Sequence, residues 1–162
     1  IEIAPKIREN QHDYQLMAEF MLSATMALNG FIAMGVSQDW ATHMIGHEIT
    51  ALHGLTHGHT LAIVLPATLQ VLREAKGDKL VQYGGGVWGI TSGTKEERID
   101  EAIRCTEQFF RSLGLTTRLR EENIGQETIL EIERRFNERG VKYGENGNVT
   151  GAVARKILET AL

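Results

Sequence analysis

Residues 42–66 read THMIGHEITALHGLTHGHTLAIVLP, and this stretch holds five of the six histidines of the chain. They are His43, His47, His53, His57 and His59. Neutral imidazole is the commonest metal-binding side chain, and its ordinary pKa of about 6.5 lets it exchange protons near neutral pH. The stretch therefore predicts a metal site or a proton-transfer site, with ordinary structural histidines as the alternative.

The spacing of the histidines predicts a turn within the stretch. His43 and His57 differ by fourteen positions, so on one unbroken helix they would lie about 21 Å apart. Gly54 lies between them and favours the left-handed conformation that ends a helix. We therefore expect a helix–turn–helix centred on Gly54. Its first helix ends near His53, and its second begins at Thr60, with His57 in the loop or first turn aimed back at His43.

A zinc-protease signature begins in this stretch but is not completed. His47 and Glu48 start the pattern H-E-x-x-H, but Ala51 stands where the second histidine is required. A zinc-dependent hydrolase is therefore disfavoured.

Length and composition limit the classes of protein that fit. The chain has 162 residues, which predicts a single helical domain over 1–162, and 17 basic against 21 acidic residues give a net charge of −4. There is no basic stripe for nucleic acid and no uninterrupted apolar run of about 18 residues for a membrane span. Cys105 is the only cysteine, which excludes a disulfide framework and fits the reducing cytoplasm.

Apolar residues at helical spacing and helix-capping signals recur along the chain. A buried helix is expected from Asp13 to Asn29-Gly30 or to Gly35. Thr94 to Glu97 has the form of a capping box that opens another helix. Further helices are expected over 78–87, 126–139 and 150–162, the first of them weakened by three consecutive glycines at 84–86. The predicted fold class is all-α, an orthogonal or up-down bundle of about seven helices.

From residue 27 to residue 66 the chain reads ALNGFIAMGVSQDWATHMIGHEITALHGLTHGHTLAIVLP. This segment resembles the iron-containing, or group III, alcohol dehydrogenases, particularly the butanol dehydrogenases and NADPH-dependent aldehyde reductases. The likeness continues through Tyr83 and Val87-Trp88 to Gly144-Glu145-Asn146. The resemblance implies hydride transfer between NAD(P) and a small-molecule alcohol or aldehyde at a divalent metal.

The resemblance also implies roles for three of the histidines. In the family the metal is held by one aspartate and three histidines, two of which are fourteen residues apart and match His43 and His57. A further family histidine, one turn after the first of that pair, lies near the nicotinamide and the substrate and matches His47. The implied metal is iron or zinc, with nickel and manganese also compatible with imidazole and carboxylate ligands. His53 and His59 have weaker claims and are expected at helix ends or on the surface.

The resemblance covers the later, helical part of the family's sequence. The other two ligands, an aspartate and a histidine four residues apart, and the α/β domain that binds NAD(P) have no counterpart in this chain. Asp39 and His43 share that spacing by coincidence, since Asp39 is expected to begin the His43 helix. We therefore expect the chain by itself to be inactive and to form homo-oligomers through apolar surface left exposed. The alternative is a non-catalytic helical scaffold that self-associates.

Overall fold

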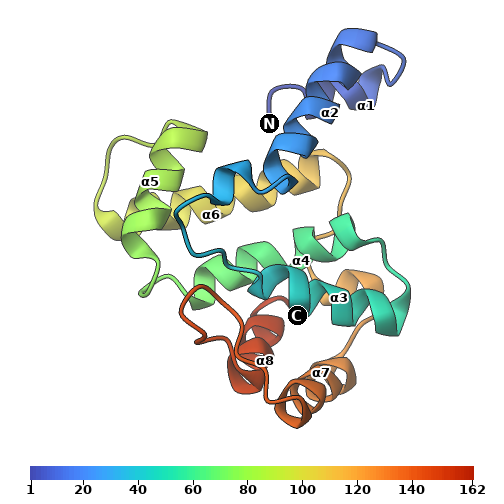
Figure 1. Ribbon diagram of the computed structural model, residues 1–162, viewed down its shortest axis with the longest axis vertical. Helices are drawn as coiled ribbons and strands as arrows, with labels where there is room; N and C mark the ends of the chain where they lie inside the picture. The colour runs from blue at the N-terminus through green and yellow to red at the C-terminus, as the bar shows by residue number, and fades with distance from the viewer. The chain divides into compact units, whose positions relative to one another are not determined.

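The computed structural model describes all residues, 1–162, and every regular element in it is helical (Figure 1). Eight α-helices and two short 3₁₀ helices are present, which confirms the predicted all-α class. An isolated antiparallel bridge joins Tyr143 and Val149. The chain divides into two compact units, Ile1–Gln38 and Asp39–Leu162.

The elements follow one another in a simple order. The first unit contains α1 (Ala4–Glu9), α2 (Tyr14–Leu28) and the 3₁₀ helix η1 (Phe31–Ala33). The second unit contains α3 (Ala41–His53), α4 (His57–Val71), α5 (Gly77–Trp88), α6 (Lys95–Ser112), the 3₁₀ helix η2 (Leu119–Glu122), α7 (Gln126–Glu138) and α8 (Gly151–Thr160).

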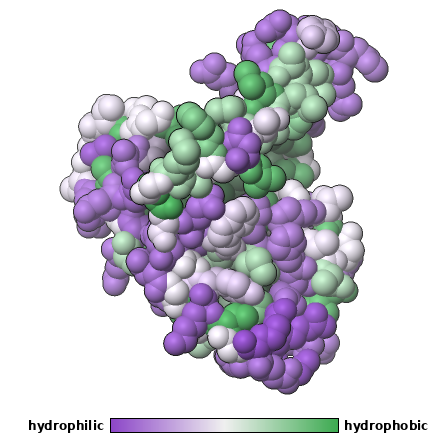
Figure 2. Space-filling view, in the orientation of Figure 1, coloured by the Kyte–Doolittle hydropathy of each residue, from purple (hydrophilic) through white to green (hydrophobic).

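Helix α2 of the first unit begins where the sequence predicts, but its side chains are not buried. Asp13 caps it by accepting a hydrogen bond from the backbone N–H of Leu16 at 3.0 Å. No residue of α1 or α2 is buried, and Met21 and Leu22 are more than half exposed. Figure 2 shows apolar side chains gathered over this unit. The prediction of a buried helix is wrong, because within its unit α2 is contacted only by the short α1 and η1.

The segment Tyr14–Ala33 is long and apolar enough to cross a membrane when judged by length and composition alone. Gln15 and Glu19 interrupt the apolar run of this segment, but Glu19 is the segment's only charged residue. A core helix of a soluble protein and a signal sequence satisfy the same criterion. The segment is therefore weak evidence for a membrane span.

The larger core of the second unit is built from α3, α4, α7 and α8 (Figure 1). Buried residues recur three or four positions apart, as Ile45 and Ile49 do on α3, so each helix turns one apolar face inward. Helix α4 contacts α3 and α8, and α8 contacts α7. The largest fully buried side chains are Phe136, Ile45, Ile49, Ile63, Leu119, Ile124, Ile129, Ile132, Ile157, Leu158, Val64 and Val149.

A smaller apolar cluster lies between α5 and α6. It contains Leu80 of α5 and Ile99 and Ile103 of α6. A Cβ on Gly84 would lie only 3.2 Å from the Cβ of Ala102, so glycine at 84 lets the two helices pack closely. Close packing thus accounts for one of the three consecutive glycines.

Several helix ends follow the signals in the sequence. The capping box is present: Glu97 N–H donates to Thr94 Oγ1 at 3.3 Å, and Thr94 N–H donates to Glu97 Oε2 at 2.8 Å. Gly114 and Gly140 follow α6 and α7 with positive φ angles of 87° and 60°, which glycine adopts readily.

The predicted helix–turn–helix is confirmed. Helix α3 ends at His53, and Gly54 adopts φ 72° in the left-handed region. Helix α4 begins at His57, three residues before the expected start at Thr60, so His57 lies in its first turn. Pro66 lies inside α4 and, because it has no N–H, removes one hydrogen bond of that helix.

Candidate metal centre

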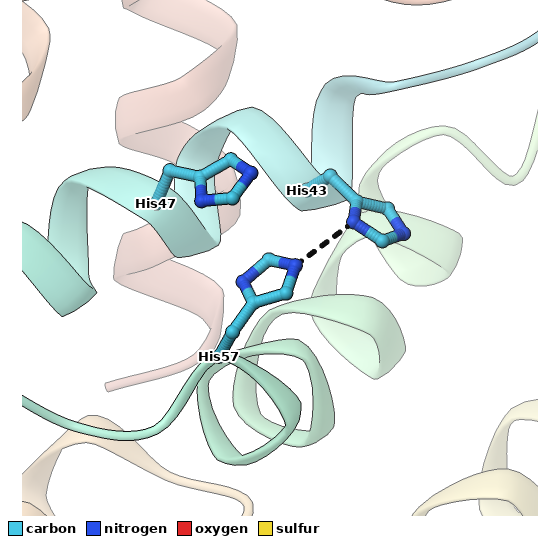
Figure 3. A group of neighbouring side chains, drawn as sticks. All are labelled: His43, His47 and His57. Atoms are coloured by element: carbon cyan, nitrogen blue, oxygen red, sulfur yellow. Dashed lines mark hydrogen bonds between the residues drawn. The ribbon is translucent and has the colours of Figure 1, made fainter. Parts of the chain in front are cut away.

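The turn at Gly54 brings His43 and His57 together, as the sequence predicts. His43 Nδ1 and His57 Nε2 lie 3.0 Å apart, and the two ring centroids are 5.0 Å apart (Figure 3). His43 lies in the first turn of α3 and His57 in the first turn of α4. The ring of Trp40 also contacts His43, with ring centroids 5.1 Å apart and 65° between the planes. Two imidazoles from different helices thus present nitrogens to one point.

His47 adds a third ring to this pair. It lies one turn after His43 on the same face of α3, and its ring stacks on that of His57, with centroids 4.2 Å apart and an angle of 2° between the planes. One potential ligand nitrogen from each of the three rings lies within 4.8 Å of the other two. His47 is exposed, whereas His43 and His57 are half-buried, so the cluster is accessible from the His47 side.

Gly46 allows α3 and α4 to approach each other closely beside the three histidines. A Cβ on Gly46 would lie 2.8 Å from Thr60 Oγ1 and 3.3 Å from Leu61 Cδ2. Thr60 is fully buried, and its hydroxyl donates to the backbone carbonyl of His57 at 2.8 Å. Gly46 therefore sets the distance between α3 and α4, and the position of His57 depends on that distance. This role could not be predicted from the sequence, because an isolated glycine in a helical pattern is a weak signal.

Glu48, the residue after His47, fastens α3 to α7. Its side chain is 11% exposed and accepts hydrogen bonds from Arg135 Nη1 at 3.2 Å and from Arg139. Arg135 also forms an ion pair with Glu131, four positions earlier on α7, at 2.8 Å. Glu48 lies 87 positions before Arg135 and 91 positions before Arg139, so no local sequence pattern predicts these contacts. They hold the histidine-bearing helix in place.

The weaker candidates lie outside the cluster and have partners of their own. His53 Nε2 lies 2.8 Å from Thr128 Oγ1, and His59 Nε2 is within hydrogen-bonding distance of Thr116 Oγ1. Asp39 accepts a hydrogen bond from the backbone N–H of Ala41, the first residue of α3, at 2.8 Å. Asp39 therefore lies just before the helix as expected, but the N-cap itself is Trp40.

Burial and the neighbouring imidazoles lower the pKa of both His43 and His57. Burial lowers the pKa of His43, and the charges that His57 and His47 would carry lower it further. Burial also lowers the pKa of His57, and His47 adds to the effect. Both shifts favour neutral imidazole near neutral pH, which is the form that binds a metal.

The donor set fits a divalent transition metal. With the usual zinc–nitrogen distance of about 2.0–2.1 Å, two ligands of a tetrahedral site lie about 3.3 Å apart. The 3.0 Å between His43 Nδ1 and His57 Nε2 is close to this value. The separation of these two nitrogens therefore suits two ligands of one ion. The other ring nitrogen of His57, Nδ1, is buried without a hydrogen-bond partner.

Comparison with known sequences places the chain in a family. The model described as "Fe-containing alcohol dehydrogenase family, C-terminal" matches residues 1–160. The chain is 47% identical over 162 residues to the NADPH-dependent aldehyde reductase YqhD of Escherichia coli K12, covering 99% of this chain and 42% of that protein. It is 36% identical over 123 residues to the NADH-dependent butanol dehydrogenase A of Clostridium acetobutylicum, covering 75% of this chain and 32% of that protein. The chain thus spans less than half the length of these relatives.

Solved structures give the same result. The crystal structure of E. coli YqhD matches with a TM-score of 0.96 and 46% identity, covering 99% of this chain and 42% of that one. The crystal structure of an NADH-dependent butanol dehydrogenase A from Thermotoga maritima matches with a TM-score of 0.90 and 27% identity, covering 99% and 42%. The apolar segment Tyr14–Ala33 lies within the residues that the family model matches. Sequence and fold together show that the chain belongs to the Fe-containing alcohol dehydrogenase family and corresponds to its C-terminal region.

Proposed function

We propose that this chain supplies the metal-binding and substrate-orienting part of an NAD(P)-dependent alcohol dehydrogenase or aldehyde reductase. The observation that carries the proposal is the convergence of His43 and His57 from two helices, with His47 beside them. Relatives described as NADPH- and NADH-dependent enzymes support the cofactor class. Because the chain spans 42% of the E. coli relative, the activity is proposed for a protein that contains this chain.

The three histidines have distinct roles in this proposal. His43 and His57 would hold iron or zinc through their neutral ring nitrogens. Bound there, the ion would polarise the oxygen of the alcohol or aldehyde as a Lewis acid, and the nicotinamide would supply or accept the hydride. His47, on the accessible side, would orient that oxygen by a hydrogen bond or pass a proton to it.

The remaining features support a cytoplasmic enzyme of small molecules. Cys105 has no thiol partner in the chain, and the net charge of −4 favours neither nucleic acid nor an anionic membrane surface. The apolar segment Tyr14–Ala33 falls inside the family match, which supports its assignment to the fold of the family.

Calorimetric titration of the chain with Zn²⁺ tests the metal centre. We expect His57→Ala to weaken zinc binding by about 100-fold or more, since even residues that only support a metal ligand contribute about 10–100-fold to affinity. His53→Ala is the matched control, because His53 pairs with Thr128 outside the cluster, and it should bind zinc like the parent chain. Equal affinities for the two variants would contradict the proposal.

A second candidate function is self-association, which the exposed apolar residues of the first unit favour. Met21 and Leu22 are 62% and 63% exposed, and further large apolar side chains of α2 and η1 are exposed with them. Light scattering should show a mass above that of the 18.0 kDa chain, and Met21→Lys with Leu22→Lys should lower it. Leu130→Lys on α7, 46% exposed, is the control and should leave the mass unchanged. A monomer at every concentration would count against homo-oligomers.

A further inference from the structure

A cavity of about 340 Å³ lies in the second unit, between the start of α3, the second half of α4 and α5. None of the six histidines lines it, so the cavity is not part of the proposed metal centre. Its volume falls at the lower end of the usual range for small-molecule sites, about 300–1,000 Å³. The cavity therefore has room for a small molecule.

The apolar part of the lining is held in place by the packing of α4 and α5 on α6. Leu69 of α4 and Leu80 of α5 both pack in the small apolar cluster with Ile99 and Ile103. Leu65, one turn before Leu69 on α4, adds a third apolar side chain to the lining. Because the core packing fixes these walls, the cavity is formed before any ligand arrives.

The charges around the cavity balance one another. Lys76 donates to Asp39 at 2.8 Å and to Glu145 at 2.9 Å, and its side chain is only 16% exposed. Lys79 donates to the side-chain oxygen of Gln82 at 2.7 Å. The two lysines offset the two carboxylates, so a charged ligand would lose its hydration without gaining a net opposite charge. The lining therefore favours an uncharged ligand.

One hydroxyl of the lining is free to bind a ligand. Thr68 Oγ1 donates to the backbone carbonyl of Val64 at 2.9 Å, and the Tyr83 hydroxyl is bonded to Thr106 Oγ1 at 2.7 Å. Thr42, half-buried in the first turn of α3, makes no hydrogen bond through its side chain, and its hydroxyl oxygen is accessible. The hydroxyl of Thr42 can therefore both donate and accept a hydrogen bond.

We infer that this cavity binds a small uncharged molecule that has an apolar body and a single hydroxyl group. The apolar body lies against Leu65, Leu69 and Leu80, and the hydroxyl group pairs with that of Thr42. Small aliphatic alcohols combine these two parts. Binding in the cavity needs neither a metal nor NAD(P), so the inference goes beyond the proposed function and does not depend on it.

Amide NMR of the metal-free 162-residue chain, titrated with 1-hexanol, tests the inference. We expect the signals of the lining residues on α3, α4 and α5 to shift together and to saturate with one dissociation constant. Hexanoate and hexylammonium have the same apolar chain but carry a charge. They should bind at least about tenfold more weakly, because their hydration is lost without a net opposite charge in the cavity.

Three substitutions show whether hexanol occupies the cavity. Thr42→Val keeps the shape of the side chain but removes the hydroxyl, and it should weaken hexanol binding by about 2–10-fold, the effect of one hydrogen bond. Thr50→Val makes the same change on the same helix, outside the cavity, and should leave binding unchanged. Leu65→Trp puts a larger side chain into the lining and should abolish detectable binding. Circular dichroism checks that each variant is folded.

The outcomes decide the inference independently of the metal centre. Saturable shifts at the lining residues that weaken in Thr42→Val support it. Shifts confined to the exposed apolar residues of α2, or hexanoate binding as tightly as hexanol, overturn it. Hexanol affinity unchanged in both Thr42→Val and Leu65→Trp also overturns it. Because these measurements contain no metal, their result does not depend on whether His43 and His57 bind zinc.

Discussion

Phe136→Ala should lower the free energy of unfolding by about 3–5 kcal/mol, the usual range for removing a buried phenylalanine ring. Phe136 is 1% exposed, and its ring packs edge-on against Tyr143 with centroids 5.3 Å apart. The guanidinium of Arg139 lies 5.4 Å from the centre of the same ring. The substitution leaves a cavity between α7 and the rest of the core. Denaturant unfolding followed by circular dichroism measures the loss.

Two variants on the same helix serve as controls. Phe136→Leu keeps most of the buried volume and should cost less than about 1.5 kcal/mol. Leu130→Ala removes a side chain that is 46% exposed and should change stability by about 0.5 kcal/mol or less. A loss for Phe136→Ala no larger than that for Leu130→Ala would mean that α7 does not pack as described.

Gly46→Val should both destabilise the chain and weaken zinc binding. A Cβ at this position already comes within 2.8 Å of Thr60 Oγ1, and valine adds two more carbons. Such overpacking costs about 1–3 kcal/mol. Because the Thr60 hydroxyl holds the carbonyl of His57, moving Thr60 also displaces a proposed metal ligand. Helix propensity by itself favours valine over glycine, so any loss of stability reports the clash between α3 and α4.

Gly58→Ala is the matched control for this change. Gly58 lies beside His57 on α4, and a Cβ there would meet nothing within 4 Å. Alanine should therefore leave zinc affinity unchanged and raise stability by at most about 1 kcal/mol. Unfolding curves and calorimetry of the two variants give the comparison. Parental stability and zinc affinity in Gly46→Val would contradict the close approach of the two helices.

The helices and the turn between them were predictable because their causes are local. Gly54 ends α3 through a conformation that glycine adopts easily, and Thr94 with Glu97 caps α6 through contacts three residues apart. The burial of α2 was predicted wrongly, because its apolar spacing shows that a face can be buried but not that a partner surface exists. The close packing at Gly84 depends on α6 and could not be read from α5 alone.

The candidate site was predictable only in part. The fourteen-residue spacing and the intervening glycine indicate that His43 and His57 can meet, and the structure brings them within 3.0 Å. The stacking of His47 on His57 depends on side-chain rotamers of two helices, which the sequence does not specify. The link from Glu48 to Arg135 crosses 87 residues, and such ion pairs have no periodic signal.

X-ray absorption at the zinc edge of the zinc-loaded chain tests most directly whether the imidazoles of His43 and His57 share one ion. The account predicts a first shell of light atoms at about 2.0–2.1 Å, accompanied by the outer-shell scattering of imidazole rings. That outer scattering should fall sharply in the double variant His43→Ala with His57→Ala. A zinc spectrum without imidazole scattering, or one that the double variant leaves unchanged, would contradict the central claim.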